Sequence, residues 1–184
     1  MQRESRSLKF EHGSFLPAFD LLGTDGRRYG SDYLKSGKAA LLVFTCNHCP
    51  YVQGSEAMLI DIARRFERDG LRVVTVNSND PSQYPDDDYG MMQEKASRLK
   101  LPYPYLYDET QELAQTLDAA CTPECYLFDR NHQLCYHGAL TDHPKESGSP
   151  RADYLTPAIT QVLEGLKPTP DYIHPMGCSI KWKR

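Results

Sequence analysis

The chain has 184 residues, of which 40% are hydrophobic and 25% are charged, and its formal net charge is −4 at pH 7. This length and composition predict a single globular domain over residues 1–184, and the dispersed basic residues give no reason to expect a nucleic-acid partner. The polar N-terminus has no apolar signal segment, and no run approaches the roughly 18 apolar residues of a membrane span. We therefore expect a cytoplasmic protein without a membrane partner.

The first half of the chain predicts a hairpin followed by a β-α-β unit. Residues 19–30 alternate in the manner typical of a β-hairpin. The apolar runs 39–46 and 71–78 predict two buried strands, and the apolar positions of residues 52–69 between them fall at helical spacing, with Gly70 as a C-terminal stop. A unit of this kind favours parallel strands joined by a right-handed crossover.

The second half predicts further helices and an antiparallel strand pair. A loop over 79–90 contains Asp86, Asp87 and Asp88, and such a run more often caps a helix than binds a cation. We expect helices at 87–100, 109–118 and 151–166, strands at 124–129 and 133–140, and an extended tail over 167–184 that packs on the domain. The predicted fold class is α/β, with a mixed central sheet flanked by helices and an N-terminal β-hairpin extension.

The six cysteines point to redox chemistry or packing rather than to a structural disulfide framework. In a reducing compartment most of them should be thiols. Cys125 and Cys135 fall in the predicted strand pair, and we interpret both as structural. Spacing sets another pair apart, because "TCNHCPYV" places Cys46 and Cys49 three positions apart at the junction of a strand and a helix.

This junction suits thiol–disulfide exchange. Residues three apart on a helical turn face the same way and can form a disulfide. Exchange requires one exposed thiolate and a second thiol within reach to resolve the mixed disulfide, and a helix N-terminus lowers the pKa of the first thiol. A cationic His48 would favour the thiolate further, and Pro50 is tolerated in a first helical turn.

Two other chemistries use the same residues. Covalent haem attachment requires Cys-x-x-Cys-His, and here the histidine lies between the cysteines, so haem is excluded. A copper or zinc carrier remains an alternative, because Cys46, His48 and Cys49 are suitable ligands and Cys121 or Cys178 can complete a set of four. Our leading expectation is a redox protein without a cofactor and without a dedicated metal site.

At this stage the sequence resembles a known group. Residues 39–52 together with "NSNDP" (77–81), "PYLYDET" (104–110), "CTPE" (121–124) and "GCSIKW" (177–182) resemble the redoxin branch of the thioredoxin-like proteins. This branch is related to the alkyl hydroperoxide reductase/thiol-specific antioxidant proteins, and its members are often described as thiol–disulfide oxidoreductases. The resemblance covers nearly the whole chain and implies a thioredoxin fold.

The resemblance also implies roles for individual residues. Cys46 would attack a substrate disulfide and Cys49 would resolve it. Thr122 and Pro123 would form the loop facing the dithiol, with Pro123 in cis, where a substrate chain can pair beside the active cysteine. The expected substrate-binding residues are Thr122, Pro50 and Asn47. Substrates would be disulfide-containing proteins or small thiols, and the reductant a thioredoxin or glutathione system.

The chain departs from its relatives in two respects. The strand before the dithiol lacks the buried acid of thioredoxin, so proton handling falls to Glu124 and His48. Peroxiredoxins place P-x-x-x-T-x-x-C at their cysteine, whereas Leu41 stands where the proline would precede Thr45. Thiol peroxidase activity is therefore an alternative rather than the main prediction.

The chain carries further indications of redox tuning. A histidine in the third position of the dithiol is typical of proteins less reducing than thioredoxin, whose potential is about −270 mV. Cys121 lies close to Pro123, and Cys178 follows a Pro-Met-Gly segment that would hold the tail in one path. Both are candidates for an additional redox thiol.

Overall fold

A computed structural model describes residues 10–145 and 152–184. The expected absence of a signal segment and the start of the predicted helix at residue 151 lie outside these residues. The strands are β1 (Asp20–Gly23), β2 (Arg28–Gly30), β3 (Ala39–Thr45), β4 (Leu71–Asn77), β5 (Tyr105–Tyr107), β6 (Cys121–Thr122), β7 (Glu124–Phe128), β8 (Leu134–Gly138), β9 (Tyr172–Ile173) and β10 (Cys178–Ser179). The helices are α1 (Ser31–Lys35), α2 (Pro50–Phe66), the short 3-10 helix η1 (Pro85–Asp87), α3 (Tyr89–Leu99), α4 (Glu112–Thr116) and α5 (Leu155–Leu163).

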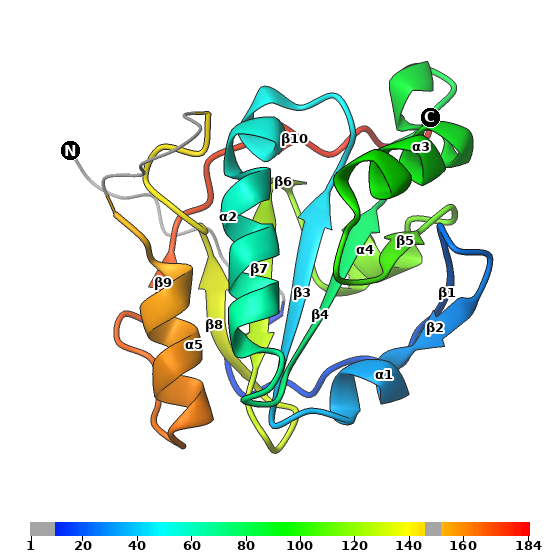
Figure 1. Cartoon of the computed structure of the whole chain (residues 1–184). Coiled ribbons are helices and arrows are strands. Elements are labelled where there is room, and N and C mark those ends of the chain that lie inside the picture. Colours follow the sequence, from blue (N-terminus) through cyan, green and yellow to red (C-terminus); the bar gives the residue numbers. More distant parts are fainter. Residues whose placement is uncertain (1–9, 146–151) are drawn as a thin grey trace.

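A mixed sheet runs through the centre of the molecule (Figure 1). In the described part of the chain it has eight strands in the order β2-β1-β5-β4-β3-β7-β8-β9, and β10 pairs separately with β6. Strands β3, β4 and β5 are parallel, whereas β7 runs antiparallel to β3 and β8 antiparallel to β7. The α/β class with a mixed sheet flanked by helices, predicted from the sequence, is confirmed.

The β3-α2-β4 unit forms the centre of the fold as predicted. Its two strands are in register from Ala39 opposite Leu71 to Thr45 opposite Asn77, and every residue of β3 is buried. A strand buried on both faces explains the continuous apolar run in the sequence. Helix α2 begins at Pro50, which the sequence analysis placed in a first helical turn, because a proline needs no hydrogen-bond acceptor for its nitrogen there.

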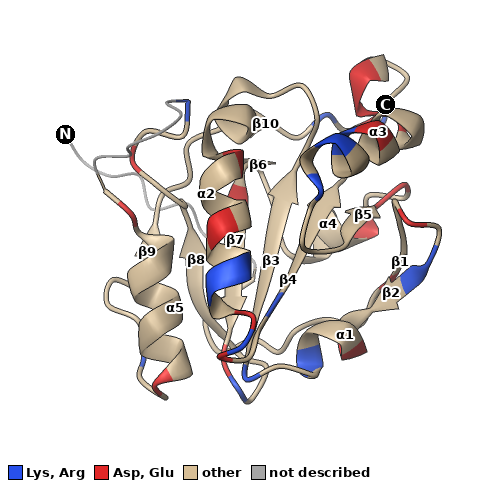
Figure 2. Cartoon of the chain, in the orientation of Figure 1, with Lys and Arg blue, Asp and Glu red and all other residues tan. Residues whose placement is uncertain are grey.

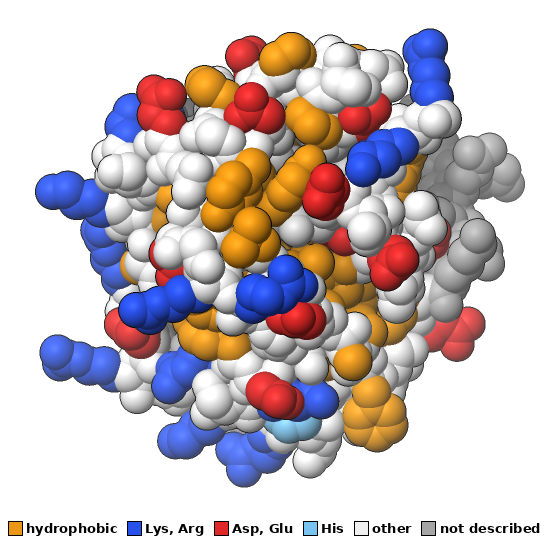
Figure 3. All heavy atoms as spheres, turned by 90° about the vertical axis from the view of Figure 1, so that its right-hand side faces the viewer, with side chains coloured by type: hydrophobic (Ala, Val, Ile, Leu, Met, Phe, Trp, Pro, Cys, Tyr) orange, Lys and Arg blue, Asp and Glu red, His pale blue; other side chains and the backbone are white. Residues whose placement is uncertain are grey.

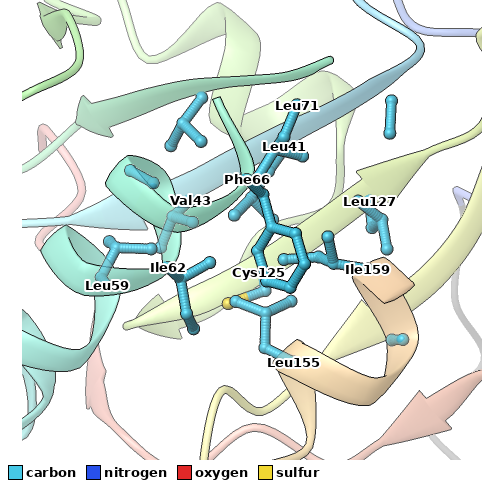
Figure 4. Packing of buried hydrophobic residues seen from close by; sticks show 14 of the residues in the cluster. Leu41, Val43, Leu59, Ile62, Phe66, Leu71, Cys125, Leu127, Leu155 and Ile159 are labelled. Atoms are coloured by element: carbon cyan, nitrogen blue, oxygen red, sulfur yellow. The ribbon is translucent and has the colours of Figure 1, made fainter. Parts of the chain in front are cut away.

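Two apolar layers hold helices on the two faces of the sheet. On one face, α2 and α5 lie side by side over β3 and β7, and Leu59, Ile62 and Phe66 of α2 share an apolar layer with Leu155 and Ile159 of α5 (Figure 4). On the opposite face, α1 and α4 supply Leu34, Leu113 and Ala114 to a second cluster. Burial of apolar surface stabilises a fold by about 25 cal/mol per Å². The apolar layers on both faces therefore hold the sheet between its helices.

The structure also contains elements that the sequence analysis did not predict. These are α1, η1, β5, β6, β9 and β10, each of five residues or fewer. Two prolines, Pro102 and Pro104, precede Tyr105–Tyr107, and this segment forms a strand because β4 and β1 pair with it on either side. The two-residue strands likewise depend on partners distant in sequence, which local patterns do not reveal.

Charged residues lie mostly in the helices and loops around the sheet (Figure 2). On the face viewed from the side of β1, β2 and α3, acidic and basic side chains are interspersed around hydrophobic ones (Figure 3). Among the described residues, no helix is both long enough and apolar enough to span a bilayer.

Candidate functional site: a cluster of three thiols at the end of the central strand

The cysteine pair lies at the carboxyl end of the central strand β3. Cys46 directly follows β3, and Cys49 is the N-cap residue of α2, with extended backbone angles of φ −73° and ψ 124°. Pro50 occupies the first helical position, so the turn between the cysteines ends where the free N–H groups of the helix begin. The predicted strand–helix junction is therefore present, and it places Cys49 nearer to the helix N-terminus than Cys46.

Both sulfur atoms are enclosed and face the Thr122–Pro123 loop. Neither cysteine has exposed surface, and together with Val52 they form a small cluster, here called the thiol cluster. The Cys46 sulfur lies 3.4 Å from Oγ1 of Thr122, and the Cys49 sulfur lies 3.4 Å from the carbonyl oxygen of Thr122. The peptide bond between Thr122 and Pro123 is cis, as the resemblance implied. The structure therefore brings the predicted dithiol and the predicted loop together.

A hydrogen bond joins the two thiols, and the surroundings of Cys49 favour its ionised form. The hydrogen bond from the Cys46 thiol lowers the pKa of Cys49 to about 4 in spite of burial, with further donors in the N–H groups of Val52 and Cys178. The same hydrogen bond, together with burial and the negative charge of Asp87, raises the pKa of Cys46. The Thr122 carbonyl can accept a hydrogen bond from Cys49 only when Cys49 is a thiol, and this single acceptor is outweighed by the donors.

These pKa directions are opposite to the sequence-based expectation. We expected the helix N-terminus to lower the pKa of Cys46, the first cysteine of the motif. The helix instead begins at Pro50, so its N-terminal N–H groups reach Cys49, and Cys46 remains at the end of the strand.

His48 is turned towards a buried carboxylate. Its Nδ1 atom lies 2.5 Å from Oδ2 of Asp87, and its ring stacks on Tyr84 with centroids 5.2 Å apart. Asp87 has no exposed surface. The nearest charged partner of a protonated His48 is therefore Asp87 rather than a cysteine thiolate. The predicted tuning of the thiolate by His48 stays a prediction.

Asp87 also organises the turn between the cysteines. Its carboxylate accepts hydrogen bonds from the backbone N–H of Asn47 at 2.7 Å and from the side-chain amide of Asn79 at 2.7 Å. The side-chain amide of Asn47 donates in turn to the carbonyl of Asp86, and its oxygen accepts from the hydroxyl of Tyr105. Asn47, expected to bind substrate, is thus engaged in holding the cysteine turn.

Adjacent residues of the acidic run 86–88 make different contacts. The side chain of Asp88 accepts a hydrogen bond of 2.8 Å from the N–H of Met91 and caps α3, as expected. Asp87 points instead into the site, which the sequence analysis missed. Three adjacent aspartates give no local signal of which one is buried, because that depends on Asn47 and Asn79 arriving from other parts of the chain.

A buried lysine, also missed from the sequence, fixes the strand end. Nζ of Lys95 in α3 donates a hydrogen bond of 2.7 Å to the carbonyl oxygen of Cys46 and forms an ion pair with Glu56 of α2. Lys95 is only 5% exposed, so the pair is largely withdrawn from water. The lysine thereby ties α3 and α2 to the backbone of Cys46.

One group of side chains has the composition of a metal site. The Cys46 sulfur, a His48 ring nitrogen and an Asp87 oxygen all lie within 4.8 Å of one another. This group contains two of the three ligands predicted from the sequence, with Asp87 in place of Cys49. A thiolate, an imidazole and a carboxylate form a donor set that suits zinc or copper.

A third thiol comes from the C-terminal tail. Strand β10 pairs antiparallel with β6, so that Cys178 is opposite Thr122 and Ser179 is opposite Cys121. The Cys178 thiol hydrogen-bonds the Cys49 sulfur and packs against the thiol cluster, and burial followed by this hydrogen bond raises the pKa of Cys178 to about 11. The structure therefore brings Cys178 to the dithiol. Successive residues of a strand point to opposite faces, so the Cys121 side chain is directed away from that of Thr122.

Three further residues singled out from the sequence are engaged in other contacts. Glu124 hydrogen-bonds His137 at 2.7 Å and the N–H groups of Ala120 and Cys121, and these contacts outweigh the effect of burial and lower its pKa. They hold the loop that precedes Pro123. Cys125 is buried opposite Gly138, and Cys135 donates to the carbonyl of Leu127, so the two do not face each other across the strand pair.

Fold and site together define a thiol redox protein with a thioredoxin fold. Residues 12–137 match the model of the AhpC/TSA family, and the chain belongs to this family. The recognition of the redoxin branch from the sequence is thereby confirmed. No protein with curated annotation matches the chain.

Solved structures extend the comparison over nearly the whole chain. An uncharacterised conserved protein from Geobacillus kaustophilus is 39% identical with a TM-score of 0.86, and the match covers 95% of this chain and 93% of that one. A hypothetical protein from Sinorhizobium meliloti is 30% identical with a TM-score of 0.89, covering 94% and 95%. A putative thiol:disulfide interchange protein DsbE from Chlorobium tepidum shares the fold at 20% identity and a TM-score of 0.67, covering 84% and 99%.

Proposed function

We propose that the chain is a thiol–disulfide oxidoreductase in which Cys49 attacks the substrate disulfide and Cys46 resolves the product. The observation that carries this proposal is the place of Cys49 at the N-cap of α2, where its sulfur receives hydrogen bonds from the Cys46 thiol and from two N–H groups. The roles are the reverse of those implied by the resemblance. The substrates we propose are disulfide-containing proteins or small disulfides.

The reaction consists of two exchange steps. The Cys49 thiolate attacks one sulfur of the substrate, forms a mixed disulfide and expels the other sulfur as a thiolate. Cys46, which gives up its proton to a departing thiolate, then attacks the Cys49 sulfur. The substrate leaves fully reduced, and the protein retains a Cys46–Cys49 disulfide. A thioredoxin or glutathione system supplies the two electrons that restore the dithiol.

Trapping experiments distinguish the two assignments of roles. With Cys178 also replaced by Ser in both variants, Cys46→Ser should accumulate a mixed disulfide on Cys49 when incubated with oxidised glutathione, whereas Cys49→Ser should accumulate none on Cys46. Mass spectrometry of the unreduced protein reads out both. A stable adduct on Cys46 in Cys49→Ser, with none on Cys49 in Cys46→Ser, would restore the order implied by the motif. If neither variant forms an adduct and the unaltered chain has no exchange activity, the oxidoreductase proposal is wrong.

A metal carrier is the second candidate, and the grouping of Cys46, His48 and Asp87 favours it. Purified protein, reduced and titrated with zinc or with copper(I) under argon, would bind one equivalent if this function holds. Asp87→Asn would then weaken binding, because it removes an anionic ligand. Stoichiometric exchange of disulfides with no metal uptake would support the oxidoreductase proposal and exclude the metal carrier.

Consumption of hydrogen peroxide, measured in the same preparation, tests the thiol peroxidase alternative.

A further inference from the structure

The C-terminal tail occupies the open edge of the loop that faces the dithiol. Strand β10 pairs with β6 at the residue directly before Pro123. The approach is so close that a Cβ atom on Gly177 would lie 2.1 Å from the carbonyl oxygen of Thr122. Addition of an extended segment to a strand edge is a common way for proteins to bind peptides. In this chain the added segment belongs to the protein itself.

The tail is held in this position by contacts beyond β10. The Lys181 carbonyl accepts hydrogen bonds from the N–H of Asp80 at 2.8 Å and from the side chain of Gln111 at 2.9 Å, and the Lys181 N–H donates to Asn79 at 2.9 Å. Ile180 is buried in the apolar cluster beneath α4. These contacts hold the tail on the C-terminal side of β10, and together with the β10–β6 pairing they fix the position of Cys178.

Cys178 meets the dithiol through the sulfur of Cys49. Its thiol and its backbone N–H both hydrogen-bond that sulfur. Cys46 and Cys49 have no exposed surface, whereas Cys178 is half-buried. The three thiols therefore form a series from the enclosed end of β3 to the surface, with Cys49 in the middle.

We propose that Cys178 is a third redox thiol, which takes over the disulfide from Cys46. This inference rests on the proposed Cys46–Cys49 exchange. Ionised Cys178 attacks the Cys49 sulfur of the Cys46–Cys49 disulfide, so that the Cys49–Cys178 bond forms and the Cys46–Cys49 bond breaks. Cys46 leaves as a thiolate and takes up the proton that Cys178 released. No net oxidation occurs, and the disulfide now includes the half-exposed cysteine, where an external thiol can reduce it.

The decisive measurement is disulfide mapping of Cys46→Ser after treatment with oxidised glutathione. With the resolving thiol removed, Cys178 should displace glutathione from Cys49, and tryptic digestion without reduction should yield a Cys49–Cys178 cross-linked peptide. Cys46→Ser combined with Cys178→Ser should retain glutathione on Cys49. A matched control, Cys46→Ser combined with Cys121→Ser, should still form the Cys49–Cys178 bond.

A variant that leaves all three thiols intact gives an independent readout. Gly177→Ala forces the tail away from Thr122, so we expect at least a severalfold slower reduction of the oxidised protein by glutathione, while the Cys46–Cys49 disulfide still forms. Ser179→Ala, which alters an exposed side chain of the same strand, should reduce at the rate of the unaltered chain.

Two outcomes separate this inference from the proposed function. If Cys46→Ser keeps glutathione on Cys49 while Cys178 is alkylated as a free thiol, the third-thiol inference is wrong, although the Cys46–Cys49 exchange stands. If the unaltered chain forms no Cys46–Cys49 disulfide and reduces no substrate, the proposed function itself fails, and the inference fails with it.

Discussion

The imidazole of His48 and the carboxylate of Asp87 form a contact of 2.5 Å at the base of the cysteine turn. The carboxylate has no exposed surface, and it also accepts from the N–H of Asn47 and from the side chain of Asn79. A buried charge of this kind is stable only when hydrogen bonds replace its lost water. The position of the residues between Cys46 and Cys49 therefore depends on Asp87.

Replacement of Asp87 by Asn tests this dependence. The amide has one acceptor in place of two, so at least one of its donors loses its partner, and we expect a loss of about 1–3 kcal/mol in the free energy of unfolding. The change also removes the negative charge that contributes to raising the pKa of Cys46, so the pKa of Cys46 should fall. Urea denaturation and alkylation of Cys46 as a function of pH measure the two effects.

The adjacent Asp86 provides the matched control. Its side chain is exposed, and its backbone carbonyl rather than its carboxylate contacts Asn47. Asp86→Asn should change the free energy of unfolding by less than about 0.5 kcal/mol. Equal losses in the two variants would show that the carboxylate of Asp87 does not hold the cysteine turn.

The pH dependence of alkylation tests the ionisation of Cys49. The thiolate is the reactive form, and the pKa of Cys49 is lowered from 9.0 to about 4. The alkylation rate of Cys49 should therefore be nearly constant from about pH 6 to pH 8 and should fall about tenfold per pH unit below pH 4. Rates are followed by mass spectrometry of peptides from protein quenched in acid.

Cys135 serves as the internal comparison in the same samples. Burial raises the pKa of this half-buried thiol to about 12, so its alkylation rate should rise tenfold per pH unit up to the alkaline limit of the experiment. A Cys49 rate that rises in parallel with that of Cys135 between pH 6 and pH 8 would contradict an ionised Cys49 at neutral pH.

The redox potential should reflect the same hydrogen bonds. Donors to the Cys49 sulfur stabilise the reduced protein, and a stabilised reduced form makes the disulfide a stronger oxidant. We expect a potential less reducing than the value of about −270 mV for thioredoxin. Equilibration with glutathione buffers, followed by quantification of the disulfide, measures it. Cys135→Ala should leave the potential unchanged, and a value at or below that of thioredoxin would count against the expectation.

Because α5 packs on the sheet through Leu155, we expect truncation of this side chain to lower the free energy of unfolding strongly. This side chain is fully buried among residues of α2 and β7 (Figure 4), so Leu155→Ala should cost about 2–5 kcal/mol of unfolding free energy. Leu166, which follows the same helix, is 58% exposed. Leu166→Ala should change stability by less than about 0.5 kcal/mol. Urea titrations that give similar midpoints for both variants would mean that α5 contributes little to the core.

Long periodic segments made much of this fold predictable from the sequence. The β3-α2-β4 unit and the β7–β8 pair follow from local apolar patterns, and the dithiol and the Thr122–Pro123 loop from the motifs. Asp87, Lys95 and Asn79 could not be found in this way, because each acquires its role from partners far away in the chain. The pKa directions of Cys46 and Cys49 depend on which donors reach each sulfur, among them the N–H of Cys178 in the distant tail, and the roles of the two cysteines stay predictions.

The side chain of Asn79 connects the cysteine turn with the C-terminal tail. Its amide nitrogen donates to Asp87 beneath the cysteine turn, while its oxygen accepts the N–H of Lys181 in the tail. Displacement of the tail would therefore also free one side of the residue that steadies Asp87. The tail is linked to the dithiol twice, through the Asn79 side chain and through the Cys178 thiol on the Cys49 sulfur, so its position sets both the support of the cysteine turn and the surroundings of a sulfur.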